Sequence, residues 1–466
     1  MEIAQNLFRI FRDKGEELYL VGGYVRDLLL GRATEDFDFA TSALPEVTRS
    51  ILESSGFKAI PIGIEFGTVA TFLQHETDKI EVQITTYRCR ESYHKGSRHP
   101  DVVFGKNLEE DLIRRDFTIN AMAISEEGKI VDPLGGRLDL KNGIIRTPLE
   151  PDVTFREDPL RMLRAFRFAC RLGFSLHPLI INAVSKLHTE IMNISRERWK
   201  LEMDLILTTP DGNSVADTLQ GMKESGILTD MIPQFKEMFE LDGVEQGNAH
   251  CTDIWNHTLD VIRHLQSNDK CLRWAALLHD IGKPETRTAS DDDDNPHFFD
   301  HEKVGAAIVN ETAEHFRFSK KERSCVAFLV KNHMRPVLYS PEWSDRAVRK
   351  LIRDSGDYLD RLIDLASADI AVHSSRFAEE GSRKLRELRI RLDDLIQDEV
   401  ERVLPKELGQ ELLNIAGSDP VRIPEISVIL SNLEELVHEG VLPAMAQVRI
   451  YMDYLTEHPD IREKNC

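Results

Sequence analysis

The sequence has few of the features that mark exported, membrane-spanning or disulfide-rich proteins. Its six cysteines are scattered over 466 residues and include no C-x-x-C pair, a pattern that argues against a disulfide framework and predicts free thiols in a reducing compartment. No run of about eighteen apolar residues occurs, and no basic leader precedes an apolar stretch. We therefore expect a soluble, cytoplasmic protein that makes no use of a membrane.

Positive charge is scarce as well. The chain has 59 Lys and Arg residues against 80 Asp and Glu residues, a formal net charge of -21. Proteins that coat nucleic acid or anionic membranes depend on many cations that release counterions. This class is excluded, and any contact with nucleic acid must be local. Residues 156–173 depart from the average, because five arginines outnumber two acidic residues there.

Length and residue patterning indicate an α+β protein of several domains. A chain of 466 residues has room for about three or four domains with sizeable cores. Apolar or alternating runs at residues 18–21, 36–39 and 80–85 predict strands, whereas helical periodicity dominates from about residue 157. We expect a head with a mixed β-sheet and helices at 1–150, followed by all-α segments at 151–240, 241–378 and 379–466.

Two aspartates, Asp36 and Asp38, flank Phe37 in one of these strands. Strand side chains alternate, so both carboxylates point one way, and they repel each other unless a cation lies between them. Glu81 would add a third carboxylate from an adjacent strand. Such hard oxygen ligands suit Mg²⁺, and two such ions can activate a hydroxyl and stabilise a leaving oxygen. The alternative for D-x-D by itself is a solvated edge strand.

A glycine pair, Gly22 and Gly23, ends the first strand and opens a helix predicted over Tyr24 to Leu30. Free backbone N–H groups at such a junction can hold phosphate oxygens, and Arg26 adds a cation on the first turn. Any tight turn favours glycine, so this feature is weak by itself. Its spacing from the two aspartates makes the combination much more specific.

The stretch GGYVRDLLLGRATEDFD resembles the signature of class II tRNA nucleotidyltransferases, the CCA-adding enzymes, and of the related bacterial poly(A) polymerases. Three further stretches resemble other motifs of this family, in the same order: EEDLIRRDFTINAM at 109–122, DPLGGRLDL at 132–140 and EDPLRMLRAFRFACRLGF at 157–174. The resemblance implies transfer of CMP or AMP from CTP or ATP to a tRNA 3′ end, with Mg²⁺ held by the catalytic carboxylates Asp36 and Asp38. The strand pattern adds Glu81 as a third catalytic carboxylate. Gly23, Arg26 and Arg115 match nucleotide-binding positions.

The segment from Glu157 onward is predicted to be helical, with Asp158 and Arg161 as neighbours at i,i+3. The ordinary interpretation is an intrahelical salt bridge, which contributes little stability. A sharper hypothesis follows from base chemistry. A carboxylate that accepts from an exocyclic amino group, beside a guanidinium that donates to a ring nitrogen, would accept C and A and reject U and G.

The family resemblance implies the same role, because Asp158 and Arg161 match positions proposed to act as an amino-acid template. Arg164 and Arg167 match nucleotide-binding positions. Each step of three residues rotates a helix back by about 60°, so Arg167 would point nearly opposite Asp158. We expect it to reach phosphate or to support the site.

A second constellation follows in WNHTLDVI, WAALLHDIGKP, VKNHM and LASADIA. It resembles the metal set of HD phosphohydrolases, which implies a divalent metal (Mg, Mn, Ni, Co or Fe) and a phosphoesterase activity. The alternative is a domain that keeps these residues only as a scaffold for RNA binding. The matching ligands are His257, His279, Asp280 and Asp369, with His301 and His333 at accessory positions.

The resemblance thus assigns a nucleotidyltransferase head to 1–150, a nucleotide-selecting neck to 151–240, an HD domain to 241–378 and a tail of possible RNA binding to 379–466. From residue 381 onward, 11 basic residues face 17 acidic ones, which weighs against RNA contact by the tail. Full CCA addition is the leading hypothesis. An A-only adding enzyme, a poly(A) polymerase, and an HD phosphohydrolase whose head only senses nucleotide or RNA stay open.

Overall fold

The computed structural model describes residues 2–34, 36–63, 66–75, 78–93, 100–105, 107–244, 252–288, 296–401, 404–416, 423–438 and 441–458. Its internal contacts divide the chain into two compact units. The large unit comprises residues 1–338 and 357–382, and the tail unit comprises residues 339–356 and 383–466. Within the described part of the chain, no helix combines the length and apolarity needed to cross a bilayer.

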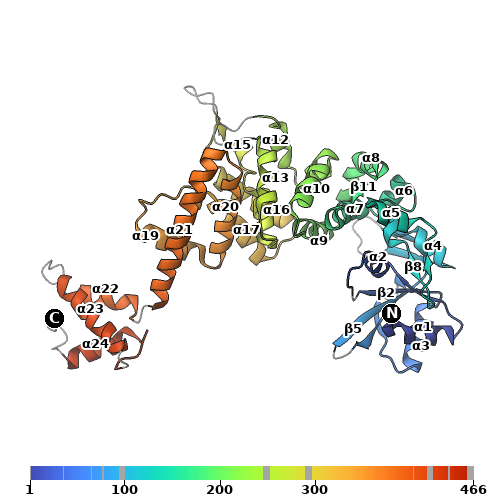
Figure 1. Ribbon diagram of the computed structural model, residues 1–466, viewed down its shortest axis with the longest axis horizontal. Coiled ribbons are helices and arrows are strands. Elements are labelled where there is room, and N and C mark those ends of the chain that lie inside the picture. The colour runs from blue at the N-terminus through green and yellow to red at the C-terminus, as the bar shows by residue number, and fades with distance from the viewer. Residues whose placement is uncertain are drawn as a thin grey trace. The chain divides into compact units, whose positions relative to one another are not determined.

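The head is built on a seven-stranded sheet with the order β3-β4-β5-β2-β1-β8-β9. Figure 1 labels β2, β5 and β8 of this sheet. Only the β2–β5 pair is parallel among these described strands, so the sheet is mixed. The strands are β1 (Leu18–Val21), β2 (Phe37–Thr41), β3 (Ile60–Gly63), β4 (Thr68–His75), β5 (Asp78–Thr86), β8 (Ala123–Ile124) and β9 (Ile130–Val131). The helices of the head are α1 (Glu2–Arg12), α2 (Gly23–Leu29), α3 (Pro45–Ser54), α4 (Leu108–Ile113), the 3₁₀ turn η2 (Thr118–Asn120) and α5 (Gly136–Asn142).

The sheet buries one face and leaves the other open because its sequence alternates. In β5, Ile80, Val82 and Ile84 are buried, whereas Glu81 and Gln83 are exposed. α1 and α3 contact the sheet, and the ring of Phe8 on α1 packs edge-on against Phe39 of β2 at 5.6 Å. The period of two therefore turns the polar side chains of β2 and β5 to the open face.

Helices make up almost all of the rest of the large unit, and the α+β prediction is confirmed. The neck contains α6 (Pro151–Glu157), α7 (Leu160–Leu172), α8 (Pro178–Leu187), the 3₁₀ segment η3 (His188–Asn193), α9 (Arg196–Leu207), α10 (Gly212–Glu224), α11 (Ile227–Met231) and α12 (Phe235–Glu240). The predicted apolar stripe of α7 is buried, with Leu160, Leu163, Phe166 and Cys170 all under 6% exposed. It packs against α9 and α10.

The HD region follows with α13 (Ile254–His264), α14 (Lys270–Leu278), α15 (Lys283–Thr286), α16 (His301–His315), α17 (Lys320–Asn332), α18 (Met334–Val337), the 3₁₀ turn η4 (Gly356–Tyr358) and α20 (Leu359–Ala371). Three short two-stranded sheets complete the large unit: β6 (Arg88–Tyr93) with β7 (Pro100–Phe104), β10 (Ile144–Ile145) with β11 (Ser175–Leu176), and β12 (Arg287–Thr288) with β13 (His297–Phe298).

The neck is fixed to the HD region by a buried polar contact. Trp274 Nε1 on α14 donates to Asp204 Oδ1 on α9 at 2.8 Å. Lys200 Nζ, one turn earlier on α9, bridges Asp204 at 2.5 Å and Glu322 of α17 at 2.9 Å. One neck helix therefore carries contacts to two HD helices.

The tail unit contains α19 (Asp345–Ser355), α22 (Lys406–Ala416), α23 (Ile423–His438), α24 (Val448–Glu457) and the part of α21 (Ser375–Glu401) that follows Ser382. α22, α23 and α24 share a small apolar core that includes Leu408, Leu433 and Tyr451. The joint suggested near residues 379–381 is not a linker, because α21 runs through it without a break. The functional boundaries at 150, 240 and 378 stay predictions.

Candidate active site and metal centre

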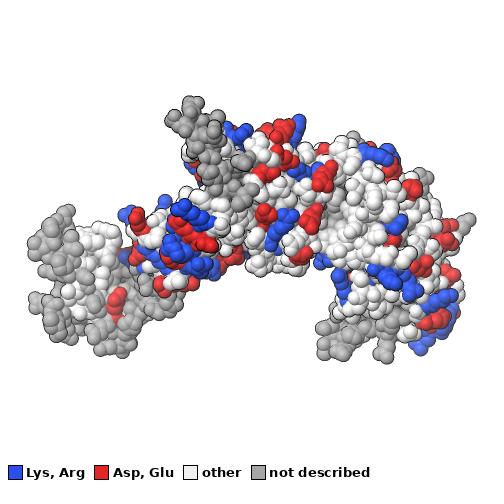
Figure 2. Space-filling view, turned by 45° about the horizontal axis from the view of Figure 1, so that its top comes forward, with Lys and Arg blue, Asp and Glu red and all other residues white. Residues whose placement is uncertain are grey.

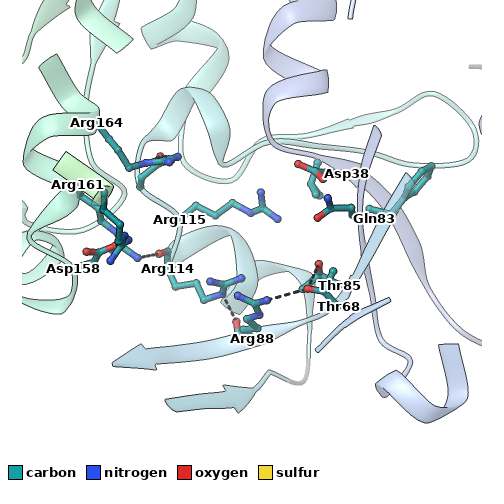
Figure 3. A pocket seen from close by; sticks show the side chains of 14 residues that line it. Asp38, Thr68, Gln83, Thr85, Arg88, Arg114, Arg115, Asp158, Arg161 and Arg164 are labelled. Carbon is teal, nitrogen blue, oxygen red and sulfur yellow. Dashed lines mark hydrogen bonds and ion pairs between the residues drawn. The ribbon is translucent and has the colours of Figure 1, made fainter. Parts of the chain in front are cut away.

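A polar cavity of about 380 Å³ lies where the open face of the head sheet meets the neck helices (Figure 3). Six arginines and three aspartates are among its fourteen lining residues, which gives it an excess of positive charge. The full lining is Val21, Asp38, Phe39, Thr68, Gln83, Thr85, Arg88, Arg114, Arg115, Asp116, Asp158, Arg161, Arg164 and Arg198. A cavity of this charge suits a ligand that carries several negative charges.

Asp38 lies at one end of the cavity, on the open face of β2 and opposite Gln83 of β5. Burial, and next the charge of Asp36, raise the pKa of Asp38 to about 6 although Arg115 opposes them. Asp36 precedes β2 and is exposed. Glu81 is also exposed, and it accepts from Gln83 Nε2 at 3.4 Å. The sheet register puts Asp38 and Glu81 on one face, and among the three carboxylates only Asp38 lines the cavity.

The glycine turn lies directly beside this carboxylate. Gly22 caps α2 with φ 71°, in the left-handed region where side chains are strained. A Cβ there would lie 3.2 Å from Arg115 Nη1 and 4.0 Å from Asp38 Oδ2. A Cβ on Gly23, the first residue of α2, would lie 3.5 Å from Arg26 Nη2. The diglycine therefore lets the backbone approach the charged groups at this end of the cavity.

Arg26 does not line the cavity. Its guanidinium donates twice to Asp27, at 2.9 and 2.8 Å, and once to Asn120 at 2.8 Å. It also lies over the ring of Phe168, 5.2 Å from the centroid. In this structure Arg26 ties α2 to η2 and α7, and the predicted contact with phosphate would require it to leave these partners.

Arg115 extends through the middle of the cavity and points toward Asp38 and Gln83 (Figure 3). It is held by Asp111, whose fully buried carboxylate pairs with Arg115 at 2.9 Å and with Arg114 at 2.7 Å. Burial alone would raise the pKa of Asp111, but Arg115 and Arg114 lower it to about 2. The backbone N–H of Arg88 also donates to this carboxylate at 3.1 Å. One buried acid thus aligns two cations of the cavity wall.

Asp158 and Arg161 lie at the opposite end (Figure 3), but they are not neighbours on one helix as predicted. α6 ends at Glu157 and α7 begins at Leu160, with Asp158 in an extended conformation between them. The cause is Pro159, because the residue before a proline avoids helical geometry. The prediction of an intrahelical salt bridge between Asp158 and Arg161 is therefore also wrong.

Both side chains have other partners. Asp158 Oδ2 accepts from Arg198 Nη2 on α9 at 3.0 Å, and Asp158 Oδ1 accepts from the backbone N–H of Leu160 at 3.1 Å. Arg161 Nη2 donates to the carbonyl of Arg114 at 2.8 Å. The carboxylate and the guanidinium are thus held at the cavity edge by groups from three separate elements.

Of the two arginines further along α7, one lines the cavity and the other lies outside its lining. Arg164 lines the cavity and pairs with Asp116 at 2.5 Å. Burial opposes ionisation of Asp116, yet Arg164 lowers its pKa to about 2. Arg167 lies outside the lining, where it pairs with Glu202 at 2.7 Å and lies 4.2 Å from the centroid of Phe168. The structure places Arg167 among supporting residues.

Sequence reasoning missed seven polar residues of the lining. Arg114 and Asp116 stand in the stretch EEDLIRRDFTINAM, next to Arg115, so a signal for them was present. The others come from strands and a helix that reach the cavity only through the fold. These others are Thr68, Gln83, Thr85, Arg88 and Arg198.

The six HD ligands predicted from the sequence come together in one buried cluster, called the HD cluster here. They come from five helices or helix ends: His257 on α13, His279 and Asp280 after α14, His301 on α16, His333 after α17 and Asp369 on α20. Asp369 Oδ1 lies 3.0 Å from His257 Nε2. Lys283 Nζ lies 2.7 Å from Asp280 Oδ2.

The donor atoms of the HD cluster fit a divalent metal. His279, His301 and His333 each place Nδ1 within 2.9 Å of a backbone carbonyl. A carbonyl only accepts, so Nδ1 carries the proton and Nε2 faces the cluster with its lone pair. Among the described residues, His279 Nε2 is buried without a hydrogen-bond partner, and Asp280 Oδ2 is buried in an ion pair with Lys283. Imidazole and carboxylate donors of this kind suit Mn, Ni, Co, Fe or Mg.

Three family models match the chain. The poly A polymerase head domain matches residues 18–146, the probable RNA and SrmB-binding site of polymerase A matches residues 173–239, and the HD domain matches residues 249–410. These matches follow the same order as the head, the neck and the HD cluster.

Curated relatives and a solved structure agree with these models. The CCA-adding enzyme of Geobacillus thermodenitrificans is 39% identical over 61% of this chain and 64% of its own length, so the match spans less than two thirds of that relative. The A-adding tRNA nucleotidyltransferase of Deinococcus radiodurans is 29% identical over 94% of this chain and 95% of its own length. The structure of the Bacillus stearothermophilus CCA-adding enzyme in complex with CTP is 27% identical, with a TM-score of 0.59, over 100% of this chain and 99% of that one.

Replacing Asp111 tests the role of the buried acid. Asp111→Asn should lower the free energy of unfolding at neutral pH by about 3 kcal/mol, because it leaves two cations without their buried partner. The folded-state pKa is lowered to about 2, so the contribution is complete above the unfolded pKa of about 3.9 and is lost as the pH falls toward 2.

Urea unfolding of wild type and variant, at neutral pH and near pH 3, measures the difference. It should shrink on acidification, and a difference that grows would contradict the assignment. Glu53→Gln, which removes an exposed ion pair with Arg49, is the matched control and should leave unfolding unchanged.

Proposed function

Because the chain belongs to the class II tRNA nucleotidyltransferases that carry an HD domain, we propose that it adds CMP and AMP, from CTP and ATP, to tRNA 3′ ends. The observation that carries the proposal is that one cavity holds Asp38 at one end, the pair Asp158 and Arg161 at the other, and Arg115 between them. A nucleoside triphosphate has the same order of parts: reacting phosphate, charged chain and base.

The head would hold Mg²⁺ through Asp36 and Asp38, with Glu81 on the same face. The donor chemistry fits, because these are carboxylates on an open sheet face and the pKa of Asp38 is raised to about 6 by burial and by Asp36. Mg²⁺ supplies activation of the attacking 3′ hydroxyl and charge neutralisation at the leaving oxygen. The protein's own part is to keep two like charges side by side, a cost that a bound cation would relieve.

Arg115 would bind the triphosphate. Its guanidinium is fixed by Asp111 and faces the glycine turn at Gly22, so it is aligned before a ligand arrives. A preordered bidentate cation loses little entropy on binding a phosphate. The backbone N–H groups of the turn and the first residue of α2 would complete the phosphate contacts.

Asp158 and Arg161 would choose the base. The carboxylate accepts from the amino group that C and A share, and the guanidinium donates to the adjacent ring nitrogen. Since Arg198 and the carbonyl of Arg114 hold these side chains, they form a rigid edge. U and G present a carbonyl and a ring N–H there and would leave both groups mismatched.

The tail unit would contact the body of the tRNA through α19. Four basic residues of this helix, Arg346, Arg349, Lys350 and Arg353, follow the spacing i, i+3, i+4, i+7 of one helix face. Figure 2 shows Lys and Arg side chains gathered, with acidic neighbours, over the segment that carries α19 and α21. This basic stripe lies before residues 381–466, whose acidic excess therefore does not include it, and it suits a phosphate backbone.

A second activity, hydrolysis of phosphate esters, would belong to the HD cluster. Its buried imidazole and carboxylate donors fit a divalent metal, which supplies an activated water when bound. The residues of the chain would hold the metal and exclude bulk water. The alternative, a ligand set kept as scaffold, predicts metal binding without turnover.

A-only addition is the second candidate for the head, because the relative that is similar over 94% of this chain is an A-adding tRNA nucleotidyltransferase. The test is incorporation of each labelled triphosphate into tRNAs that end before CCA or after CC, and into an unrelated RNA. CCA addition predicts CMP and then AMP on the first tRNA. AMP only on the tRNA that ends in CC would establish A-only addition, and AMP on any RNA would establish a poly(A) polymerase.

The two centres should separate by mutation. Asp38→Asn should lower nucleotide incorporation by about 10³-fold or more, because metal ligation contributes several kcal/mol to the transition state, and should leave phosphoesterase activity intact. His279→Ala should lower phosphoesterase activity and leave nucleotide incorporation intact. Incorporation that survives Asp38→Asn would defeat the head assignment, whereas a silent HD cluster in the wild type would defeat only the second activity.

Asp158→Ala should relax base choice by about 5- to 150-fold, which corresponds to about 1–3 kcal/mol of discrimination per paired contact. The measurement is the ratio of kcat/KM for CTP or ATP to that for UTP or GTP. Lys186→Ala, on the exposed neck surface, is the control. An unchanged ratio in Asp158→Ala would contradict the role as base reader.

A further inference from the structure

Two thiols lie together between α14 and α17. The described cysteines Cys89, Cys170, Cys271 and Cys325 are free thiols. Cys271 is the second residue of α14, and Cys325 lies in the middle of α17, a helix that packs against α14. The Cys325 thiol donates a hydrogen bond to the sulfur of Cys271, and this bond is the first of the causes that lower the pKa of Cys271 and raise the pKa of Cys325.

The two helices lie side by side and run in the same direction. In their first turns, Lys270 Nζ of α14 lies 2.5 Å from Glu322 Oε1 of α17. Directly after their last residues, the rings of His279 and His333 have centroids 5.4 Å apart. The helices therefore stay in contact from their starts to their ends.

The thiols lie on the same line of contact as these rings. Cys271 precedes His279 by eight positions, and Cys325 precedes His333 by eight positions. Positions i and i+8 belong to one stripe of a helix, so the stripe of α14 that carries Cys271 faces the stripe of α17 that carries Cys325. Helix axes about 8–10 Å apart, with Cα atoms about 2.3 Å from each axis, bring facing Cα atoms to about 4–6 Å. Disulfides span Cα distances of about 4.4–6.8 Å, so the packing already suits a covalent link.

The two thiols differ in access and in electrostatic surroundings. Cys271 is partly exposed and lies in the first turn of α14, where the helix dipole favours a thiolate. Besides the hydrogen bond from Cys325, the charge of Arg361 lowers the pKa of Cys271, whereas burial, Asp269 and Glu322 oppose this. Cys325 is only 3% exposed, and burial raises its pKa further. The more accessible thiol is therefore also the more readily ionised one.

We propose that Cys271 and Cys325 form a reversible disulfide on exposure to hydrogen peroxide, with Cys271 as the attacking thiol and Cys325 as the resolving thiol. The sulfur of Cys271 attacks one peroxide oxygen, the O–O bond breaks, and a sulfenic acid forms with release of one water. The sulfur of Cys325 then attacks the sulfenic sulfur, the S–S bond forms, and a second water leaves. The two thiols give up two electrons and two protons, and the peroxide takes up both. This inference does not depend on the activities proposed above.

The cross-link would join two helices that also hold the neck. Glu322 of α17 accepts from Lys200 of α9 at 2.9 Å, and Lys270 of α14 lies 3.6 Å from Asp204 of α9. The disulfide would close a chain segment between positions 271 and 325, and such closure restricts the unfolded chain. Oxidation should therefore stabilise the HD region and its junction with the neck.

The experiment maps the disulfide in the full-length protein. The reduced protein is treated with hydrogen peroxide, its remaining thiols are blocked, and its tryptic peptides are analysed by mass spectrometry. Trypsin, which cleaves after Lys and Arg, leaves the two thiols in the short peptides 271–273 and 324–331. We expect these peptides to be joined after oxidation and to separate with dithiothreitol. Unjoined peptides, or equal pairing with other cysteines, would overturn the proposal.

Single substitutions separate the two roles. Cys325→Ala should accumulate a sulfenic acid on Cys271, which dimedone traps as a mass gain, whereas Cys271→Ser should leave Cys325 as an unmodified thiol. Cys89→Ser, which removes an exposed thiol of β6, is the matched control and should form the disulfide as the wild type does. A dimedone adduct on Cys325 in Cys271→Ser would overturn the assignment of roles. The wild-type peptide map decides the disulfide even if the Cys325 variant fails to fold.

Thermal unfolding gives a second readout. The oxidised wild type should melt about 5 °C above the reduced protein, and peroxide should not shift the melting temperature of Cys271→Ser. A cross-linked protein that melts below the reduced one would show that α14 and α17 must be displaced to form the bond, which would contradict the inferred fit.

Discussion

The buried carboxylate of Asp111 is the contact from which the cavity is organised. Its two oxygens accept hydrogen bonds from Arg114 and Arg115. Arg115 approaches Gly22 and Asp38, while the backbone carbonyl of Arg114 receives Arg161. Burying these charges carries a desolvation penalty, but removing one partner from such a buried group costs still more, so the three side chains stay together.

Phe168 of α7 is a second point at which charged groups of the head and the neck gather. Three guanidinium groups surround its ring at 4.2 to 5.5 Å, those of Arg26, Arg164 and Arg167. Cations attract the face of an aromatic ring but repel one another, so each is also paired with an acid: Asp27, Asp116 and Glu202 respectively. Among these pairs, Arg164–Asp116 joins the neck helix to the head, and Arg26 of the head lies over the ring of Phe168 of the neck.

One helix, α9, serves both candidate centres. Its first turn carries Arg198, which donates a hydrogen bond to Asp158 at the cavity edge. Its next turns carry Lys200 and Asp204, which contact α14 and α17 of the HD region. The His279–Asp280 pair directly follows α14, so the two polar centres share a common rigid support although their chemistry differs.

Much of this arrangement was readable from the sequence by itself. The period of two predicted the face of Asp38, the glycine pair predicted the junction between the first strand and its helix, and the types and order of the histidines and aspartates indicated a metal cluster. Such signals are local, because backbone geometry acts over a few residues. Even a local signal can be overlooked: Pro159 breaks the helix that was expected to join Asp158 to Arg161.

Only the tertiary structure decided which groups meet across elements. The pairing of Asp158 with Arg198, the support of Arg161 by a carbonyl of the head, and the contacts of Asp280 with His257 and His301 join residues 21 to 47 positions apart. Such contacts depend on how apolar faces pack between helices and sheet. Residue periodicity identifies a buried face but does not specify which element covers it.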